Sequence, residues 1–235
     1  MGKTCIFLIH GITKTNKELE KIASFLNSNK IKTITPLLPG HGTCPYDRET
    51  CFKHFWKTTS KDWFKYAERE FLKCRKKFDK IYVGGVSLGG NIAIMLASKH
   101  KHYINGLILI GTPIFLSKIM SLGYCSGKIA LKIKNVKNKK SKEYHGLPIK
   151  KILEMKEIID ESRYKLKELH MPVIIFQSKK DDIANPKSAN YIFKKIKVKH
   201  KKLIWFNNEV HGINTTSTKS SKFMAKKILE FIKQS

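Results

Sequence analysis

The chain has 235 residues, 41% of them hydrophobic, and its 47 basic and 18 acidic side chains give a formal net charge of +29 at pH 7. This is enough for one domain with a substantial core; no apolar run could cross a bilayer, and residues 4–9 are too short for a signal peptide, so we expect a cytoplasmic protein. Five cysteines without a C-x-x-C pair argue against a disulfide framework or a metal site.

Apolar runs typical of buried strands alternate with amphipathic stretches along the whole chain. Strands that read as continuous apolar runs between helices indicate a parallel sheet covered on both faces. We therefore predict one α/β domain over residues 1–235, with a mostly parallel sheet of about six strands. The predicted strands are residues 4–9, 32–37, 80–84, 106–111, 172–177 and 202–206, and the predicted helices begin near residues 17, 61, 90, 186 and 217.

Residues 85–89 form a G-x-S-x-G pentapeptide between a predicted strand and a predicted helix. A serine on such a strand-to-helix turn has strained backbone angles, and its hydroxyl stands clear of the sheet. The glycines on both sides leave room for the turn, because a Cβ there would meet the neighbouring strand or helix. The context predicts that Ser87 is a nucleophile, with an ordinary turn as the alternative.

Residues 112–169 interrupt the alternation because they contain no convincing strand. An insertion at this point would lie above the C-terminal ends of the strands, so we predict a small helical cap. The segment opens with apolar residues and continues through a lysine-rich stretch at 128–142. We expect its apolar side chains either to contact a substrate or to pack the cap onto the body; these are Ile114, Phe115, Ile119 and Met120.

A serine hydroxyl needs a base within hydrogen-bond reach, and a histidine oriented by a carboxylate is a suitable one. His211 follows the last predicted strand, whereas the other eight histidines lie in early loops or on charged surfaces. Asp181 and Asp182 follow the preceding strand, so the chain order is Ser, Asp, His. We predict His211 as the base and Asp181 as its carboxylate, with Asp182 as the alternative.

The segment His10-Gly11-Ile12-Thr13 directly follows the first predicted strand. A second donor for a developing oxyanion is expected at that place, beside the amide that follows the nucleophile. We therefore predict that the backbone N–H groups of Ile12 and Leu88 form an oxyanion hole. The alternative is that residues 10–13 only end the strand with a turn.

Together these features resemble the α/β-hydrolase fold, and more narrowly its branch of bacterial carboxylesterases and monoacylglycerol lipases. The resemblance favours Asp181 over Asp182 as the carboxylate. Two departures are the Ile at position 12, where the family often has an aromatic residue, and the short, basic cap. The matching segments are residues 10–11, 38–42 (Leu-Pro-Gly-His-Gly), 62–63 (Asp-Trp), 85–90, 181–190 and 211–212.

The resemblance implies a serine esterase that hydrolyses esters of short to medium acyl chains, monoacylglycerols among them, without metal or organic cofactor. The same residues would also suit a thioesterase or a peptidase. A different alternative is a non-catalytic basic module that binds anionic membrane or nucleic acid.

The charge has two explanations. Nearly all of it is lysine, whereas proteins that read nucleic acid favour arginine, so we expect no specific nucleic-acid partner. Lysines spread along a chain rich in Asn and Ile suit the codon bias of an AT-rich genome. Alternatively, the lysines make peripheral contact with anionic membranes or acidic substrates.

Overall fold

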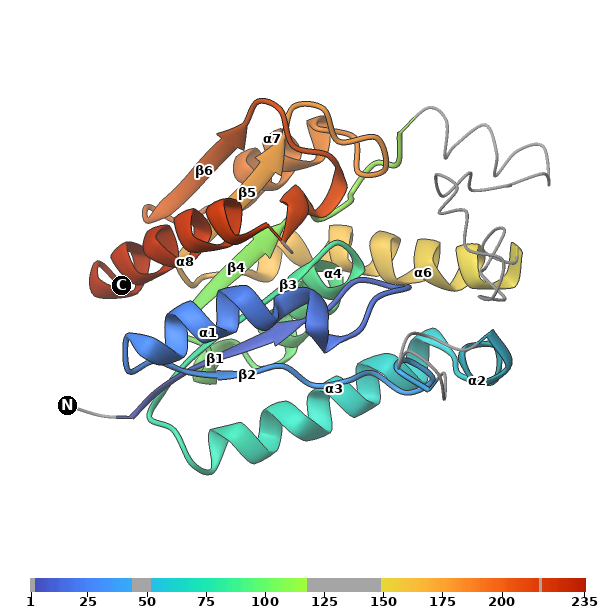
Figure 1. Cartoon of the computed structure of the whole chain (residues 1–235), viewed down its shortest axis with the longest axis horizontal. Helices are drawn as coiled ribbons and strands as arrows, with labels where there is room; N and C mark the ends of the chain where they lie inside the picture. Colours follow the sequence, from blue (N-terminus) through green and yellow to red (C-terminus); the bar gives the residue numbers. More distant parts are fainter. Residues whose placement is uncertain (1–2, 44–51, 118–148, 216) are drawn as a thin grey trace.

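The computed structural model describes residues 3–43, 52–117, 149–215 and 217–235, and its centre is a six-stranded sheet (Figure 1). The strand order is β2-β1-β3-β4-β5-β6, and every neighbouring pair is parallel. The predicted parallel sheet is thus confirmed. The strands are β1 (Thr4–Ile9), β2 (Lys32–Ile34), β3 (Lys80–Val86), β4 (Gly106–Ile110), β5 (Val173–Ser178) and β6 (Lys201–Phe206).

Helices connect successive strands and cover both faces of the sheet. They are α1 (Glu20–Ser28), α2 (Phe52–Lys57), α3 (Ser60–Arg75), α4 (Leu88–Lys99), α6 (Ile149–Lys165), α7 (Lys187–Lys195) and α8 (Thr218–Lys233). The short 3-10 helices are η1 (Asn16–Leu19), η2 (Lys101–Tyr103), η3 (Leu166–Glu168) and η4 (His211–Asn214). None of the helices in the described ranges is long and apolar enough to span a membrane.

Two hydrophobic cores lie on opposite faces of the sheet, because successive strand residues point to opposite faces. Ile6 and Leu8 of β1 pack with α1 and α8, which lie side by side over one face (Figure 1). Phe7 and Ile9 belong to the other core, with residues of α3, α4, α6 and α7. With both faces covered, the strands need apolar residues throughout, which explains the continuous runs in the sequence.

The elements differ from the predicted ones mainly at their ends. The helix expected from residue 17 starts as a 3-10 turn before α1, and β2 stops at Ile34 although the apolar run continues. The short helix α2 was not predicted, because its six residues are too few to show a helical period. The type and order of the long elements agree with the prediction.

The predicted cap, residues 112–169, is only partly described. Residues 112–117 leave β4 as a loop that joins Ala184 through a β-bridge at Leu116. Helix α6 packs along α4 and α3, with Ile152, Met155 and Ile158 buried in the core. Residues 118–148 lie outside the described ranges, so a cap over the site stays a prediction.

Candidate active site

Ser87 lies on the tight turn between β3 and α4, where the pentapeptide placed it. Its φ of 52° and ψ of −123° are unusual for a residue with a side chain, and its N–H donates to Ile110 O at 2.8 Å. The turn needs its glycines: a methyl group on Gly85 would lie 2.4 Å from the backbone of Gly89, and one on Gly89 would lie 2.2 Å from Ile9 O. The local sequence therefore fixes the place of the serine against β1.

The imidazole of His211 lies between the Ser87 hydroxyl and a carboxylate. Its Nε2 is 2.8 Å from Ser87 Oγ, and its Nδ1 is 2.8 Å from Asp181 Oδ1. A carboxylate accepts, so the Nδ1 nitrogen carries the proton and Nε2 is free to accept the proton of the hydroxyl. The sheet brings together side chains that are 124 and 30 positions apart in the chain.

The carboxylate of Asp181 is held rigidly in the loop after β5. Its side chain is fully buried, and Oδ1 also accepts from the backbone N–H groups of Ile183 and Ala184 at 3.0 and 2.8 Å. Oδ2 accepts from the side-chain amide of Gln177 at 3.1 Å. The neighbouring Asp182 is exposed. Of the two aspartates left open by the sequence, the fold thus brings Asp181 to the histidine.

The two predicted oxyanion donors belong to the residue after the serine and to the loop after β1. Leu88 is the first residue of α4, and an N–H in the first turn of a helix has no acceptor within that helix. Ile12 follows β1, which pairs with β3 up to Ile9 opposite Gly85. Within the described part of the chain, neither amide donates to another backbone carbonyl. The role of these two N–H groups as oxyanion donors stays a prediction.

His10 is a buried structural partner of the loop that contains Ile12. Its Nε2 accepts from Leu38 N–H at 3.1 Å, which leaves the proton on Nδ1 to bond Gly11 O at 2.8 Å. Burial, together with the nearby ring of His41, lowers the pKa of His10 to about 3. The imidazole is thus neutral at physiological pH and holds the peptide unit between Gly11 and Ile12.

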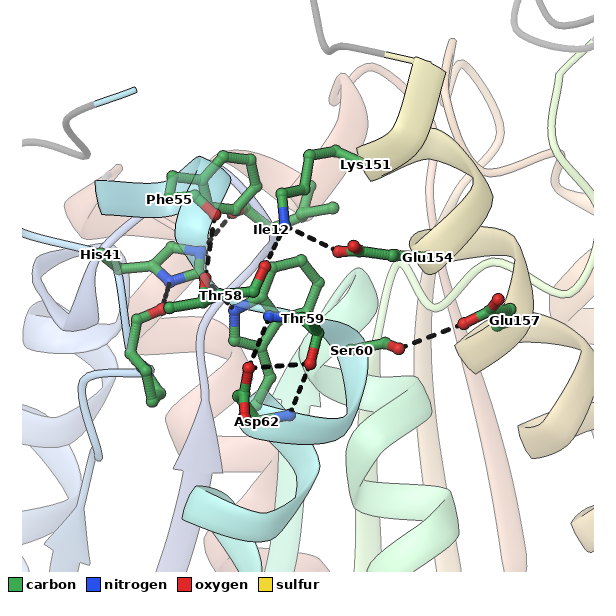
Figure 2. Close-up of polar contacts among 12 residues, drawn as sticks. Ile12, His41, Phe55, Thr58, Thr59, Ser60, Asp62, Lys151, Glu154 and Glu157 are labelled. Carbon is green, nitrogen blue, oxygen red and sulfur yellow. Dashed lines mark hydrogen bonds and ion pairs between the residues drawn. The ribbon is translucent and has the colours of Figure 1, made fainter. Parts of the chain in front are cut away.

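His41 holds the next peptide unit, because its Nε2 bonds Ile12 O in a short contact (Figure 2). Its ring lies edge-on to Phe55 and Trp63, with centroids 5.1 and 5.8 Å away. Burial lowers the pKa of His41. It therefore acts here as a neutral donor to the backbone, and the two aromatic rings fix its orientation.

A buried lysine lies next to the rings of Phe55 and Trp63 (Figure 2). Lys151 of α6 is fully buried; its Nζ contacts Thr58 O and forms an ion pair with Glu154 at 2.8 Å. The same Nζ is 5.2 Å from the ring centroids of Phe55 and Trp63. This arrangement connects α6 to the α2–α3 corner, next to the loop with the proposed oxyanion donor.

Of the apolar residues predicted to contact substrate, the structure describes two. Ile114 lies in the loop after β4, and its side chain is buried in the core. Phe115 is half-buried, its N–H accepted by Ser188 Oγ at 2.9 Å and its ring edge-on to Tyr191 at 5.2 Å. Ile119 and Met120 lie outside the described residues. The described ranges hold no cluster of three or more His, Cys, Asp or Glu side chains suited to a metal ion.

The sequence analysis missed His10 and His41 as partners of the loop after β1, and it missed Glu18, whose Oε2 accepts from Gly11 N–H at 2.7 Å. The two histidines carry a usable signal, since each precedes a glycine in an early loop. Glu18 carries none, because an acidic residue near the start of a helix is usually a solvated one.

Comparison with known proteins gives two family matches. Residues 4–140 match a family model described as alpha/beta hydrolase fold. Residues 118–234 match one described as PhoPQ-activated pathogenicity-related protein.

The chain is 26% identical over 216 residues to a thermostable monoacylglycerol lipase of Bacillus sp. (strain H-257), covering 89% of this chain and 83% of that protein. It is 22% identical over 240 residues to a carboxylesterase of Bacillus subtilis (strain 168), covering 99% and 94%. Among solved structures, the Paleococcus ferrophilus monoacylglycerol lipase superposes with a TM-score of 0.75 at 18% identity, covering 98% of this chain and 95% of that chain. A chain described with LipS and LipT, two metagenome-derived lipolytic enzymes, gives 0.82 at 21% identity, covering 99% and 94%.

Proposed function

Because the chain belongs to the alpha/beta hydrolase fold family, we propose that it is a serine esterase acting on small carboxylic esters of short to medium acyl chains, monoacylglycerols among them. The observation that carries the proposal is the single imidazole, His211, within hydrogen-bond distance of both Ser87 Oγ and Asp181 Oδ1. Similarity to a monoacylglycerol lipase and a carboxylesterase favours ester substrates.

In the proposed reaction Ser87 Oγ attacks the acyl carbonyl while His211 Nε2 takes the hydroxyl proton. The amides of Ile12 and Leu88 stabilise the negative charge on the carbonyl oxygen, and Asp181 stabilises the imidazolium. His211 then gives the proton to the leaving alcohol, which breaks the ester bond and leaves the acyl group on Ser87. Water, deprotonated by the same imidazole, releases the acid and restores the hydroxyl.

In the proposed complex, the acyl chain of the substrate lies on the side of the predicted cap. Ile114 and Phe115 follow β4, the neighbour of the strand that carries Ser87, and are the described members of the predicted contact set. We also assign Ile119 and Met120 to the acyl-binding site and residues 112–169 to a cap. The length of acyl chain that this site accepts can be measured.

The test is hydrolysis of p-nitrophenyl esters from C2 to C16 together with labelling by a fluorophosphonate. We expect turnover and labelling of the wild type, and a loss of at least about 10⁴-fold in kcat with no labelling for Ser87→Ala. The exposed Ser24 supplies the control, Ser24→Ala, which should behave as wild type. Matched thioester and amide substrates, run in parallel, decide between an esterase and a thioesterase or peptidase. A wild type that neither turns over nor labels would refute the hydrolase proposal.

A further inference from the structure

A second carboxyl group lies beside the proposed nucleophile. Glu18, on the 3-10 helix η1, is half-buried, and its Oε2 accepts from Gly11 N–H at 2.7 Å. A methyl group placed on Gly11 would be 3.4 Å from that oxygen and 3.6 Å from Ser87 Cβ. The carboxyl of Glu18 is therefore separated from the serine by little more than Gly11 itself.

The contacts at Gly11 fix two consecutive peptide units. Its N–H belongs to the unit between His10 and Gly11 and bonds Glu18, whereas its carbonyl belongs to the unit between Gly11 and Ile12 and bonds His10 Nδ1 at 2.8 Å. Each unit is planar, so fixing both determines φ and ψ of Gly11 and hence the direction of the Ile12 N–H. Glycine is the residue that most needs such fixing, because its backbone is the most permissive.

Resting on the function proposed above, we propose that Glu18 is a positioning residue: it holds the Gly11 amide so that the Ile12 amide faces the oxyanion formed at Ser87. His10 holds one of the two peptide units and Glu18 the other. Loss of either contact frees the loop to rotate its donor away. This loss raises the free energy of the transition state and not that of the bound substrate, because the oxyanion does not exist before the attack.

The acceptor for Gly11 N–H does not depend on the charge of Glu18. Burial is the largest influence and raises the pKa of Glu18, while the Gly11 hydrogen bond, Lys14 and His211 lower it. A carboxylate and a neutral carboxyl both have an oxygen that can accept from Gly11 N–H, and so does the amide of Glu18→Gln.

Two substitutions at position 18 test the hydrogen bond to Gly11 N–H. For Glu18→Ala we expect kcat on p-nitrophenyl butyrate to fall about 100-fold with KM changed less than about 3-fold, the size of losing one oxyanion donor. For Glu18→Gln we expect a loss of no more than about 10-fold, because the amide oxygen still accepts. Glu20→Ala and Glu20→Gln, on an exposed residue of α1, should match the wild type.

The hydrogen bond is also visible without any turnover. In the ¹H–¹⁵N spectrum of the whole chain, the Gly11 amide proton should move upfield in both Glu18 variants, and furthest in Glu18→Ala. Wild-type kcat in a folded Glu18→Ala, or a loss confined to KM, would overturn the positioning role. If Glu18→Ala does not fold, an unmoved Gly11 resonance in Glu18→Gln overturns it. Failure of the esterase proposal is read separately, from the wild type and Ser87→Ala.

Discussion

At the scale of single residues, backbone strain marks both sides of the Ser87–His211 contact. Ser87 has φ of 52°, and Ile213, two residues after His211, has φ of 53°. A β-branched residue rarely adopts positive φ, and such conformations persist only where the surroundings enforce them. Ile213 is fully buried in the core beneath α8, so packing there holds the turn that presents the imidazole.

The aspartate pair gives a matched test at the same scale. Asp181→Asn should lower kcat by about 10³–10⁴-fold, because an amide in place of the carboxylate favours the wrong tautomer of His211. Asp182→Asn changes an exposed side chain and should stay within about 3-fold of the wild type. Steady-state kinetics on one p-nitrophenyl ester suffices. Equal losses in the two variants would contradict the assignment of Asp181.

At the scale of elements, α6 is fastened to the corner between α2 and α3. Lys151, in the first turn of α6, contacts Thr58 O, and Glu157, six residues further along the helix, accepts from Ser60 Oγ at 3.2 Å (Figure 2). The corner itself is rigid, because Thr59 and Asp62 form a capping box at the start of α3. The aromatic rings between this corner and His41 then connect α6 with the loop that carries Ile12.

The contribution of the buried Lys151–Glu154 ion pair to stability can be measured. Lys151→Met should destabilise the protein by about 3 kcal/mol, because it leaves the Glu154 carboxylate buried without a partner. For a chain of this length the midpoint of thermal unfolding falls by roughly 6–12 °C. The adjacent, exposed Lys150→Met should change stability by about 0.5 kcal/mol or less.

A second replacement checks the cause of that loss. The double variant Lys151→Met/Glu154→Leu removes both charges and should recover part of the lost stability. A double variant less stable than Lys151→Met would show that packing around the lysine stem, and not the unpaired carboxylate, dominates.

At the scale of the whole molecule, the positive charge of the described residues is spread over both sides of the sheet. Exposed lysines occur there on helices over both faces. For this part of the chain, the distribution is the one that the compositional explanation predicts, and not a single docking face for anionic membranes. Examples of these exposed lysines are Lys21 of α1, Lys65 of α3, Lys99 of α4, Lys194 of α7 and Lys219 of α8.

Global stability should fall in acid more steeply than carboxylates alone require. The pKa of His10 is about 3 in the folded chain, so its ring stays neutral while the unfolded chain takes up a proton below about pH 6.5. The contribution of His10 to stability is complete above that pH and is lost progressively as the pH falls toward 3. The pKa of His41 is also lowered, so its contribution changes with pH in the same direction.

Thermal unfolding of the wild type and of His10→Gln between pH 4 and pH 8 checks this expectation. The variant should be less stable at pH 8, and its stability should decrease less on acidification. The exposed His102→Gln is the control and should follow the wild-type curve. Parallel curves for the wild type and His10→Gln would contradict the contribution of His10.

Much of the fold and of the candidate site follows from local patterns in the sequence. Buried parallel strands appear as apolar runs, and the glycines around Ser87 reflect a turn that admits no Cβ. The fold explains why the remaining residues escaped prediction. Lys151 resembles its solvated neighbour Lys150, and only the packing of α6 on α3 buries it. Glu18 meets its partner Gly11 only because the turn from Gly11 to Lys14 brings η1 back to the end of β1.

The order of the strands also sets when, during synthesis, the proposed chemistry can begin. β1, β2 and β3 form one side of the sheet and leave the ribosome first, so the turn with Ser87 can form early. The imidazole follows β6, at the opposite edge and 124 positions later in the chain. A nascent chain therefore carries a serine without its base, and hydrolysis starts only after β6 has been added to the sheet.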